Sequence, residues 1–131
     1  LQIAKKNAKS INVSRKISFL RSNLLENLKT PVDVIVANLP YISTSEMNTL
    51  SLEVKKEPKI ALLGGENGTD LIAKLIRQSP KHLKKNGKLI LEISPSQKNI
   101  VFSLIKENFP KSNPKVHKDY AKTERAISIE I

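Results

Sequence analysis

Asn38, Leu39, Pro40 and Tyr41 form the segment of this 131-residue chain with the clearest capacity for chemistry. The Asn38 side chain offers an amide carbonyl acceptor and an NH2 donor. Pro40 imposes a turn that directs backbone carbonyls outward, and the Tyr41 ring supplies an aromatic wall. Together these groups can hold a planar NH2 group, in an amide or in an aminopurine, and fix the orientation of its plane.

Methyl transfer from a sulfonium donor is the chemistry that fits such a site. An amide or aminopurine nitrogen is a poor nucleophile because its lone pair is delocalised, so alignment with the methyl carbon becomes the main contribution a protein can make. Good alignment is worth about 7 to 11 kcal/mol in favourable cases. An Asn-x-Pro sequence also occurs in purely structural turns, and these four residues alone leave that alternative open.

The residues before Asn38 predict the element that positions the site. The β-branched run Val32–Ala37 is typical of a buried parallel strand, and the residue before Pro40 is restricted to an extended conformation. In open α/β sheets, ligands bind beyond the carboxyl ends of the strands. We therefore expect residues 38–41 to lie at the ligand-binding edge of a sheet.

Apolar spacing and breaking residues predict the other elements. In the first half of the chain we expect a helix over 2–10, a short strand at 17–20 and an irregular stretch over 43–63 with a helical turn near 46–52. In the second half we expect a helix between Thr69-Asp70 and Pro80, a turn at Asn86-Gly87, a strand over 88–93 and an antiparallel pair near 114–118 and 126–131. A further helix should start at Ser94-Pro95, with its inner face at Ile100, Val101, Leu104, Ile105 and Phe109. Strands that alternate with helices predict one α/β domain with a mostly parallel sheet.

Composition limits the function classes. The net charge of +11 allows contact with RNA or the ribosome, but the lysines are scattered and form no dense block, so a compositional bias explains them equally well. No run of about 20 apolar residues could cross a membrane. The absence of cysteine excludes disulfides and thiolate metal sites, and His82 and His117 lack neighbours at ligand spacing. We expect no membrane contact, no metal and a cytoplasmic location.

Several motifs, in order along the chain, resemble one family. Residues 33–42, D-V-I-V-A-N-L-P-Y-I, resemble the strand and N-P-P-Y-I motif of amide and amino methyltransferases. The pattern E-P-x-x-A-L-x-G-G-x-x-G-x-D-L over 57–71 is similar to the release-factor glutamine N5-methyltransferases. So are K-L-I-L-E-I over 88–93 followed by Gln97, and K-D-Y over 118–120 followed by Arg125. The resemblance covers essentially the whole chain.

The resemblance implies a Rossmann-like class I methyltransferase sandwich with an antiparallel C-terminal strand. It implies an enzyme that uses S-adenosyl-L-methionine to methylate a glutamine side chain, with the G-G-Q loop of a peptide chain release factor as substrate and a role in translation termination. In this family's pattern, Asn38 accepts from the substrate amide beside the methionine end of the donor. The Leu39 carbonyl is the second acceptor, Pro40 makes the turn, Tyr41 forms the wall, and Asn23 lies near the adenine.

Three departures from the family pattern qualify these expectations. Leu39 replaces a proline, and the resulting N-L-P-Y is familiar from rRNA adenine dimethyltransferases, so an RNA adenine N6-methyltransferase is the alternative function. Asn23 stands where the family often has an acid, which would weaken a charge-assisted hydrogen bond. No glycine-rich turn precedes Leu1. We therefore expect residues 1–131 to be a partial catalytic domain without its N-terminal strands, incomplete for cofactor binding, with an inactive fragment as a third possibility.

Three acidic residues near these motifs have structural interpretations. Asp33 is better explained as a strand acid near a cap than as a catalytic group. Glu57 is expected to pin the loop that carries the substrate by accepting backbone N–H groups. Glu92, in a strand that reads as buried, is expected to form a salt bridge with a lysine.

Overall fold

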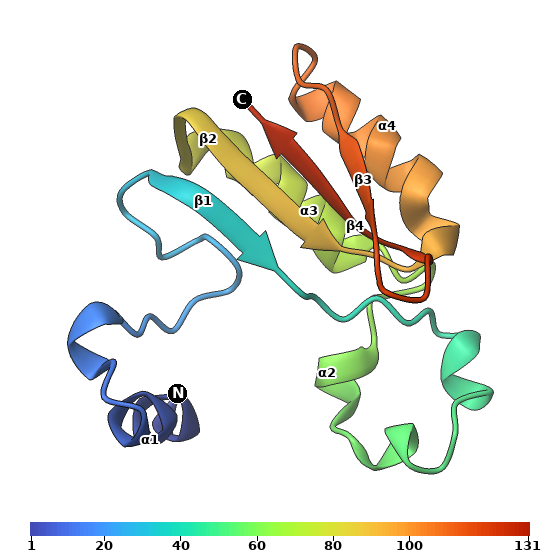
Figure 1. Ribbon diagram of the computed structural model, residues 1–131. Coiled ribbons are helices and arrows are strands. Elements are labelled where there is room, and N and C mark those ends of the chain that lie inside the picture. Colours follow the sequence, from blue (N-terminus) through green and yellow to red (C-terminus); the bar gives the residue numbers. More distant parts are fainter.

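The computed structural model describes all residues, 1–131. Its centre is a four-stranded mixed sheet with two helices packed on one face (Figure 1). The strands are β1 Val32–Ala37, β2 Leu83–Glu92, β3 Lys115–Lys118 and β4 Glu124–Glu130. The helices are α1 Gln2–Ser10, α2 Lys59–Leu62, α3 Asp70–Gln78 and α4 Lys98–Asn108. Short 3-10 turns, among them Glu46–Asn48 and Val54–Lys56, join these elements.

The strand order is β1-β2-β4-β3, and the direction of each strand follows from its pairing. β1 pairs with β2 in parallel, and β4 pairs antiparallel with both β2 and β3. Three strands therefore run one way and β4 alone runs the other. The expected sheet, mostly parallel with an antiparallel C-terminal strand, is confirmed.

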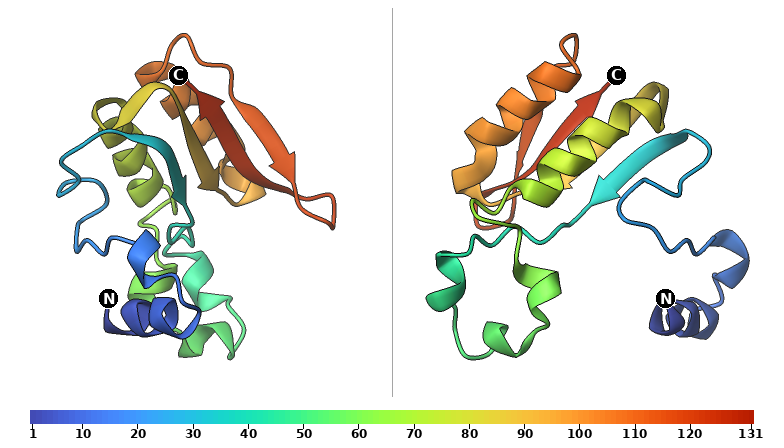
Figure 2. Two further views of the ribbon diagram at one scale, coloured as in Figure 1. Left: turned by 60° about the vertical axis from the view of Figure 1, so that its left-hand side comes forward. Right: turned by 180° about the vertical axis from the view of Figure 1, so that it is seen from behind.

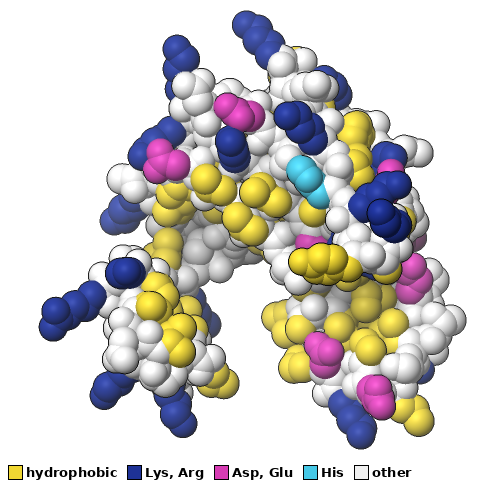
Figure 3. Space-filling model, in the orientation of Figure 1, with side chains coloured by type: hydrophobic (Ala, Val, Ile, Leu, Met, Phe, Trp, Pro, Cys, Tyr) yellow, Lys and Arg dark blue, Asp and Glu magenta, His cyan; other side chains and the backbone are white.

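The hydrophobic core lies between the sheet and helices α3 and α4, which cover the same face (Figure 2). Alternate residues of β2 and β4, such as Leu89, Leu91 and Ile127, point into this layer and are almost fully buried. The opposite face remains open in these 131 residues, and apolar side chains gather on it (Figure 3). The side chains of Val34 and Val36 are 48% and 71% exposed there. The predicted strand over 32–37 is thus confirmed, but it is an edge strand in which only Ile35 is buried.

The predicted strand at 17–20 is wrong. Ile17 has an extended backbone, but residues 17–20 pair with no other strand, and the side chains of Ile17 and Leu20 are about half exposed. An extended segment becomes a strand only where a neighbour accepts its hydrogen bonds. Here the chain leads from α1 to β1 along a path outside the sheet (Figure 1).

The turn predicted at Asn86-Gly87 lies inside β2, which begins earlier than expected. As β1 advances from Val32 to Val34, the paired residue on β2 jumps from Leu83 to Lys88. Asn86 adopts a left-handed φ of 63° within this irregularity, and its N–H donates to the carbonyl of Ile131 at 2.7 Å. Asn86-Gly87 therefore forms an irregularity within β2 that is hydrogen-bonded to Ile131, the residue that follows β4.

The predicted start of the last helix is confirmed. Ser94 and Gln97 form a reciprocal capping box with Pro95 in the first turn, and this turn leads directly into α4. Val101, Ile105 and Phe109 are buried on the inner face, whereas Ile100 is 48% exposed, contrary to the sequence prediction. None of the helices combines the length and the apolar composition that a membrane span requires.

Candidate active site

Residues 38–41, called the elbow below, directly follow β1 at the carboxyl end of the parallel pair (Figure 1). Asn38 is exposed, whereas Leu39, Pro40 and Tyr41 are half-buried. The side chains of Leu39 and Tyr41 pack against the hydrophobic core. The elbow is thus held in place by the hydrophobic core. Asn38 lies at the edge of the sheet formed by the carboxyl ends of the parallel strands, where ligands of α/β proteins bind.

Several acceptors of the elbow make no hydrogen bond within the chain. Among them are the side-chain amide oxygen of Asn38 and the backbone carbonyls of Leu39 and Pro40. The carbonyl of Tyr41, by contrast, accepts from the side-chain amide of Gln97 at 2.8 Å. Two acceptors that are adjacent in sequence therefore remain free for a ligand that carries two N–H groups.

A short parallel bridge joins the chain after the elbow to the chain before α3. The N–H of Ile42 donates to the carbonyl of Leu62 at 3.0 Å, and the N–H of Gly64 donates to the carbonyl of Ile42 at 2.9 Å. The N–H of Thr44 then donates to the carbonyl of Gly65 at 3.1 Å. These bonds hold residues 64–68, called the glycine loop below, against the elbow.

The glycines allow this close approach. A Cβ on Gly64 would lie 2.6 Å from the carbonyl oxygen of Pro40, a distance that no side chain tolerates. A Cβ on Gly68 would meet the carbonyl oxygen of Tyr41, and Gly68 also has a left-handed φ of 72°. The G-G-x-x-G motif is therefore a packing surface for the elbow. Sequence reasoning recognised it only as a family signature and missed this role.

A second capping box fixes the chain on the exit side of the elbow. The Glu46 carboxylate accepts from the Ser43 hydroxyl at 2.6 Å and from the Ser43 N–H at 2.9 Å. The hydroxyl and then the N–H of Ser43 lower the pKa of Glu46 below its usual value. The S-x-x-E spacing at residues 43–46 is a recognised helix-start signal, so this feature could have been read from the sequence but was not.

The Tyr41 hydroxyl donates to the Glu92 carboxylate at 3.4 Å, at the carboxyl end of β2. Burial raises the pKa of Tyr41, the Glu92 charge raises it further, and Arg125 opposes this shift. The Tyr41 ring therefore stays neutral beside the elbow. The predicted salt bridge between Glu92 and a lysine is wrong. Lys88, on the same strand, pairs instead with Glu130 at 3.4 Å.

Asn23 lies apart from the elbow in the structure. Its side-chain amide donates to Glu26 at 2.9 Å, and Glu26 forms an ion pair with Lys74 on α3 at 2.7 Å. The same loop is tied to the end of α3, where Gln78 accepts from the N–H of Leu25 at 2.9 Å. These contacts hold Asn23 beside α3, and the structure does not bring it together with Asn38. Its contact with the adenine stays a prediction.

Asp33 and Glu57, the other two acidic residues considered from the sequence, do not contribute to the elbow. The Asp33 carboxylate pairs with Lys84 at 2.9 Å near the start of β1, so its role is structural. Glu57 is exposed and its side chain accepts no hydrogen bond, so the prediction that it pins the loop is wrong. No group of three or more His, Cys, Asp or Glu side chains could hold a metal ion.

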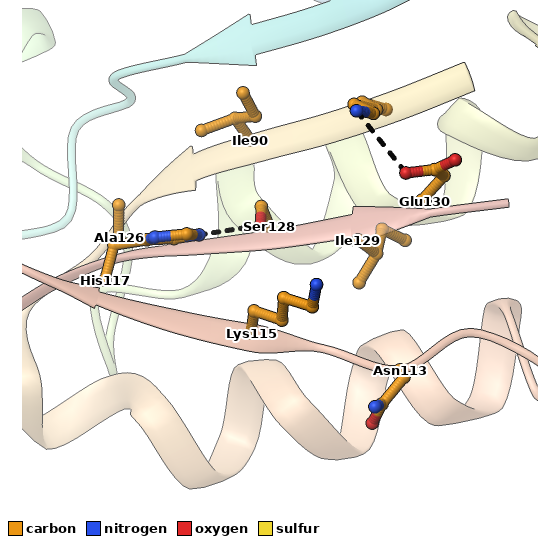
Figure 4. A pocket seen from close by; sticks show the side chains of 9 residues that line it. Ile90, Asn113, Lys115, His117, Ala126, Ser128, Ile129 and Glu130 are labelled. Atoms are coloured by element: carbon orange, nitrogen blue, oxygen red, sulfur yellow. Dashed lines mark hydrogen bonds and ion pairs between the residues drawn. The ribbon is translucent and has the colours of Figure 1, made fainter. Parts of the chain in front are cut away.

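The largest hollow of the molecule, about 660 Å³, lies on the open face of the sheet and is lined by none of the elbow residues. Side chains of β2, β3 and β4 form it (Figure 4). There the His117 ring nitrogen Nε2 lies 2.7 Å from the Ser128 hydroxyl. The size of a hollow therefore does not identify the catalytic site. The free acceptors at the end of β1 remain the best candidate for that site.

Comparison with curated proteins identifies relatives over nearly the whole chain. The Release factor glutamine methyltransferase of Rhodopirellula baltica is 37% identical over 133 aligned positions, which cover 99% of this chain and 45% of that protein. The Ribosomal protein uL3 glutamine methyltransferase of Francisella tularensis subsp. tularensis is 36% identical over 98 positions, which cover 74% of this chain and 31% of that protein. The chain thus spans less than half the length of these relatives and matches the C-terminal part of the release factor enzymes.

A solved structure supports the fold. The ribosomal protein L11 methylase from Lactobacillus delbrueckii subsp. bulgaricus superimposes with a TM-score of 0.63 at 20% identity. The superposition covers 98% of this chain and 50% of that protein. The sheet and its helices therefore have the Rossmann-like architecture of a methyltransferase. No protein-family profile matches the chain.

Proposed function

Because this chain belongs to the release factor glutamine methyltransferase family and spans less than half of its relatives, we propose that it forms the substrate-binding part of an S-adenosyl-L-methionine-dependent protein-glutamine N5-methyltransferase. In this proposal, residues 1–131 are a partial catalytic domain. The free acceptors of Asn38 and Leu39 carry the proposal, because they lie side by side in sequence at the carboxyl end of β1.

The elbow would bind the substrate glutamine through its side-chain NH2 group. The two N–H groups donate to the Asn38 amide oxygen and to the Leu39 carbonyl, which fixes the plane of the amide. The elbow would then aim the nitrogen at the methyl group of the donor. The donor would supply an electrophilic methyl carbon, and its sulfur would take up the electron pair of the broken carbon–sulfur bond. The methylated nitrogen releases one of its protons to solvent, and the neutral amide is restored.

S-adenosyl-L-methionine supplies an electrophilic methyl group on a sulfonium sulfur. The residues present fit this donor in part. Asn38 is exposed and free of internal partners, so its amide can also meet the methionine end of the donor. Gly64 and Gly68, however, pack against the elbow, Gly65 lies against Asp70 and Gly87 lies in β2. None of them forms a phosphate- or donor-binding turn after a strand. Donor binding would thus need more groups than these residues provide.

Tyr41 would close one side of the substrate amide. Its ring is held by the core and by Glu92, and its raised pKa keeps the hydroxyl protonated. A neutral aromatic wall excludes water and adds no charge that would compete for the N–H groups of the substrate. This arrangement favours hydrogen bonds to the two elbow oxygens.

The proposed substrate is a peptide chain release factor, which would place the reaction in the cytoplasm. Relatives named for release factors match 97% to 99% of the chain, whereas the uL3 relative matches 74%. The uL3 ribosomal protein is therefore the second substrate to test, and the RNA adenine alternative rests on the N-L-P-Y spelling and the net charge of +11.

The test uses the protein at its full natural length with S-adenosyl-L-methionine and three acceptors: release factor, uL3 and ribosomal RNA. Mass spectrometry of the digested products locates any added methyl group. We expect one methyl group on the side-chain nitrogen of the release factor G-G-Q glutamine. Methylation of adenine with no methylation of either protein would contradict the proposal.

A further inference from the structure

We propose that Gln97 is a positioning residue that determines which backbone carbonyls of the elbow face the substrate. This inference rests on the proposed function. It concerns a side chain from the start of α4, outside the elbow itself.

Gln97 is the link between three separate segments. Its side chain is only 6% exposed, and all of its polar atoms are used. The amide nitrogen Nε2 donates to the carbonyl of Tyr41 at 2.8 Å and to the carbonyl of Gly68 at 2.9 Å. The amide oxygen Oε1 accepts from the N–H of Ser94 at 3.2 Å. One buried amide thus joins the elbow, the glycine loop and the start of α4.

These bonds select the acceptors. Successive carbonyls in the elbow could each point towards a substrate. The carbonyl of Tyr41 is occupied by Gln97, and that of Pro40 lies against Gly64. The carbonyls of Leu39 and Pro40 accept no hydrogen bond, and of these two the Pro40 carbonyl is the one that lies against Gly64. Gln97 therefore occupies the Tyr41 carbonyl, and in the proposal this bond holds the peptide planes of the elbow so that the Leu39 carbonyl stays available beside Asn38.

Helix capping by itself does not require an amide at this position. Glutamine and glutamate both serve as the last residue of a capping box, because the N–H of the cap residue needs only an acceptor. Two donors are useful only for the carbonyls of Tyr41 and Gly68. A glutamate at position 97 could keep the capping contact with Ser94, but as a carboxylate it would lose both donors.

The test compares Gln97→Glu with Ser94→Ala in the full-length protein. Gln97→Glu removes the two donors to the elbow and glycine loop, whereas Ser94→Ala removes the capping hydroxyl and leaves these donors in place. We expect kcat of Gln97→Glu to fall by up to about 100-fold with an unchanged KM for the methyl donor. Ser94→Ala should keep its kcat within about threefold, although the loss of the capping hydroxyl should lower its melting temperature.

The pH profile separates positioning from stability. Burial raises the pKa of a carboxyl group, so the substituted carboxyl becomes protonated as the pH falls and regains one donor. The activity of Gln97→Glu relative to wild type should therefore rise towards lower pH, while the ratio for Ser94→Ala stays flat. Equal losses of kcat in both variants, with flat ratios, would overturn the proposal. If Gln97→Glu is too unstable to purify, the uncharged Gln97→Met tests the same loss of donors by kcat alone.

A crystal structure of Gln97→Glu tests the inference independently of activity. We expect the Tyr41 carbonyl to rotate and the orientation of the Leu39 carbonyl to change with it. An unmoved elbow would overturn the positioning role. If wild type methylates no glutamine, the proposed function fails, and this structure still decides whether Gln97 holds the elbow.

Discussion

At the scale of single residues, the site depends on which polar groups remain free. Asn38 and the Leu39 carbonyl have no partner in the chain, although nearby polar groups such as the Ser43 hydroxyl and the Tyr41 carbonyl are fully engaged. An exposed acceptor without an internal partner is available to a ligand, so these two oxygens are the candidates for substrate binding.

Asn38→Ala should lower kcat for glutamine methylation by about 100- to 1,000-fold, the usual loss when one preorganised polar group is removed. The side chain is exposed and makes no internal hydrogen bond, so the free energy of unfolding should change by less than about 0.5 kcal/mol. Steady-state kinetics and urea unfolding measure the two effects. Asn113→Ala, an exposed asparagine before β3, is the control, and equal activity of the two variants would remove Asn38 from the mechanism.

Tyr41→Phe should have a small effect. The hydroxyl makes one long hydrogen bond, 3.4 Å to Glu92, so its loss should cost at most about 1 kcal/mol in urea unfolding. The aromatic wall remains, and kcat should stay within about threefold of wild type. A large fall in kcat would show that the hydroxyl itself takes part in the reaction.

At the scale of elements, contacts from separate segments of the chain fix the position of the elbow. β1 ends at the residue before the elbow, the glycine loop packs against the elbow carbonyls, and the start of α4 contributes Gln97. A change in any of these should therefore reach the site without touching a substrate.

Gly68→Ala should destabilise the protein and reduce activity together. Its left-handed φ of 72° costs a non-glycine residue about 1 to 2 kcal/mol, and the added methyl group would collide with the Tyr41 carbonyl. Urea unfolding and methyl-transfer kinetics measure both losses. Asn67→Ala, in the same loop but exposed, is the matched control. A Gly68→Ala protein as stable and active as this control would show that the close packing is unimportant.

Local signals predicted much of the fold. The β-branched run of β1, the apolar face of α3 and the Ser94-Pro95 start of α4 each form from neighbours in sequence, so their positions could be predicted. The strand at 17–20 could not be judged this way, because a strand needs a partner.

Much of the site was beyond sequence reasoning for the same reason. The elbow was predicted from its residue types and its place after a strand. The role of Gln97 was not, because its partners lie 56 and 29 residues away. The packing of the glycine loop against the elbow is likewise a contact between distant segments, and no local pattern encodes it.

At the scale of the whole molecule, the chain carries a net charge of +11 and a few carboxylates with lowered pKa values. Lys74 lowers the pKa of Glu26, the Ser43 hydroxyl lowers that of Glu46, and the Thr123 N–H lowers that of Asp119. Each carboxylate is bound more favourably in the folded state when ionised. Each therefore stabilises the fold above its unfolded pKa, near 4.5 for Glu26 and Glu46 and 3.8 for Asp119.

The melting temperature should consequently fall as the pH drops below about 4.5, where the unfolded chain binds protons before the folded one does. The positive charge rises over the same range and adds repulsion. Circular dichroism melts between neutral pH and about pH 3 measure the effect. Glu46→Gln should show a shallower decline than wild type, and identical pH dependence of the two proteins would exclude Glu46 from the acid response.

The isolated 131-residue chain should bind S-adenosyl-L-methionine weakly. It spans less than half of its relatives, and its glycines pack against the elbow or Asp70 or lie in β2. Isothermal titration calorimetry measures the affinity directly. Binding in the micromolar range by this chain alone would show that the groups described here suffice for the donor.

A crystal structure of the full-length protein with a release factor peptide that contains the G-G-Q glutamine tests the central claim most directly. The account predicts that the glutamine side-chain nitrogen lies about 2.7 to 3.2 Å from both the Asn38 amide oxygen and the Leu39 carbonyl oxygen. A glutamine bound elsewhere, or an Asn38 side chain turned away from it, would contradict the account.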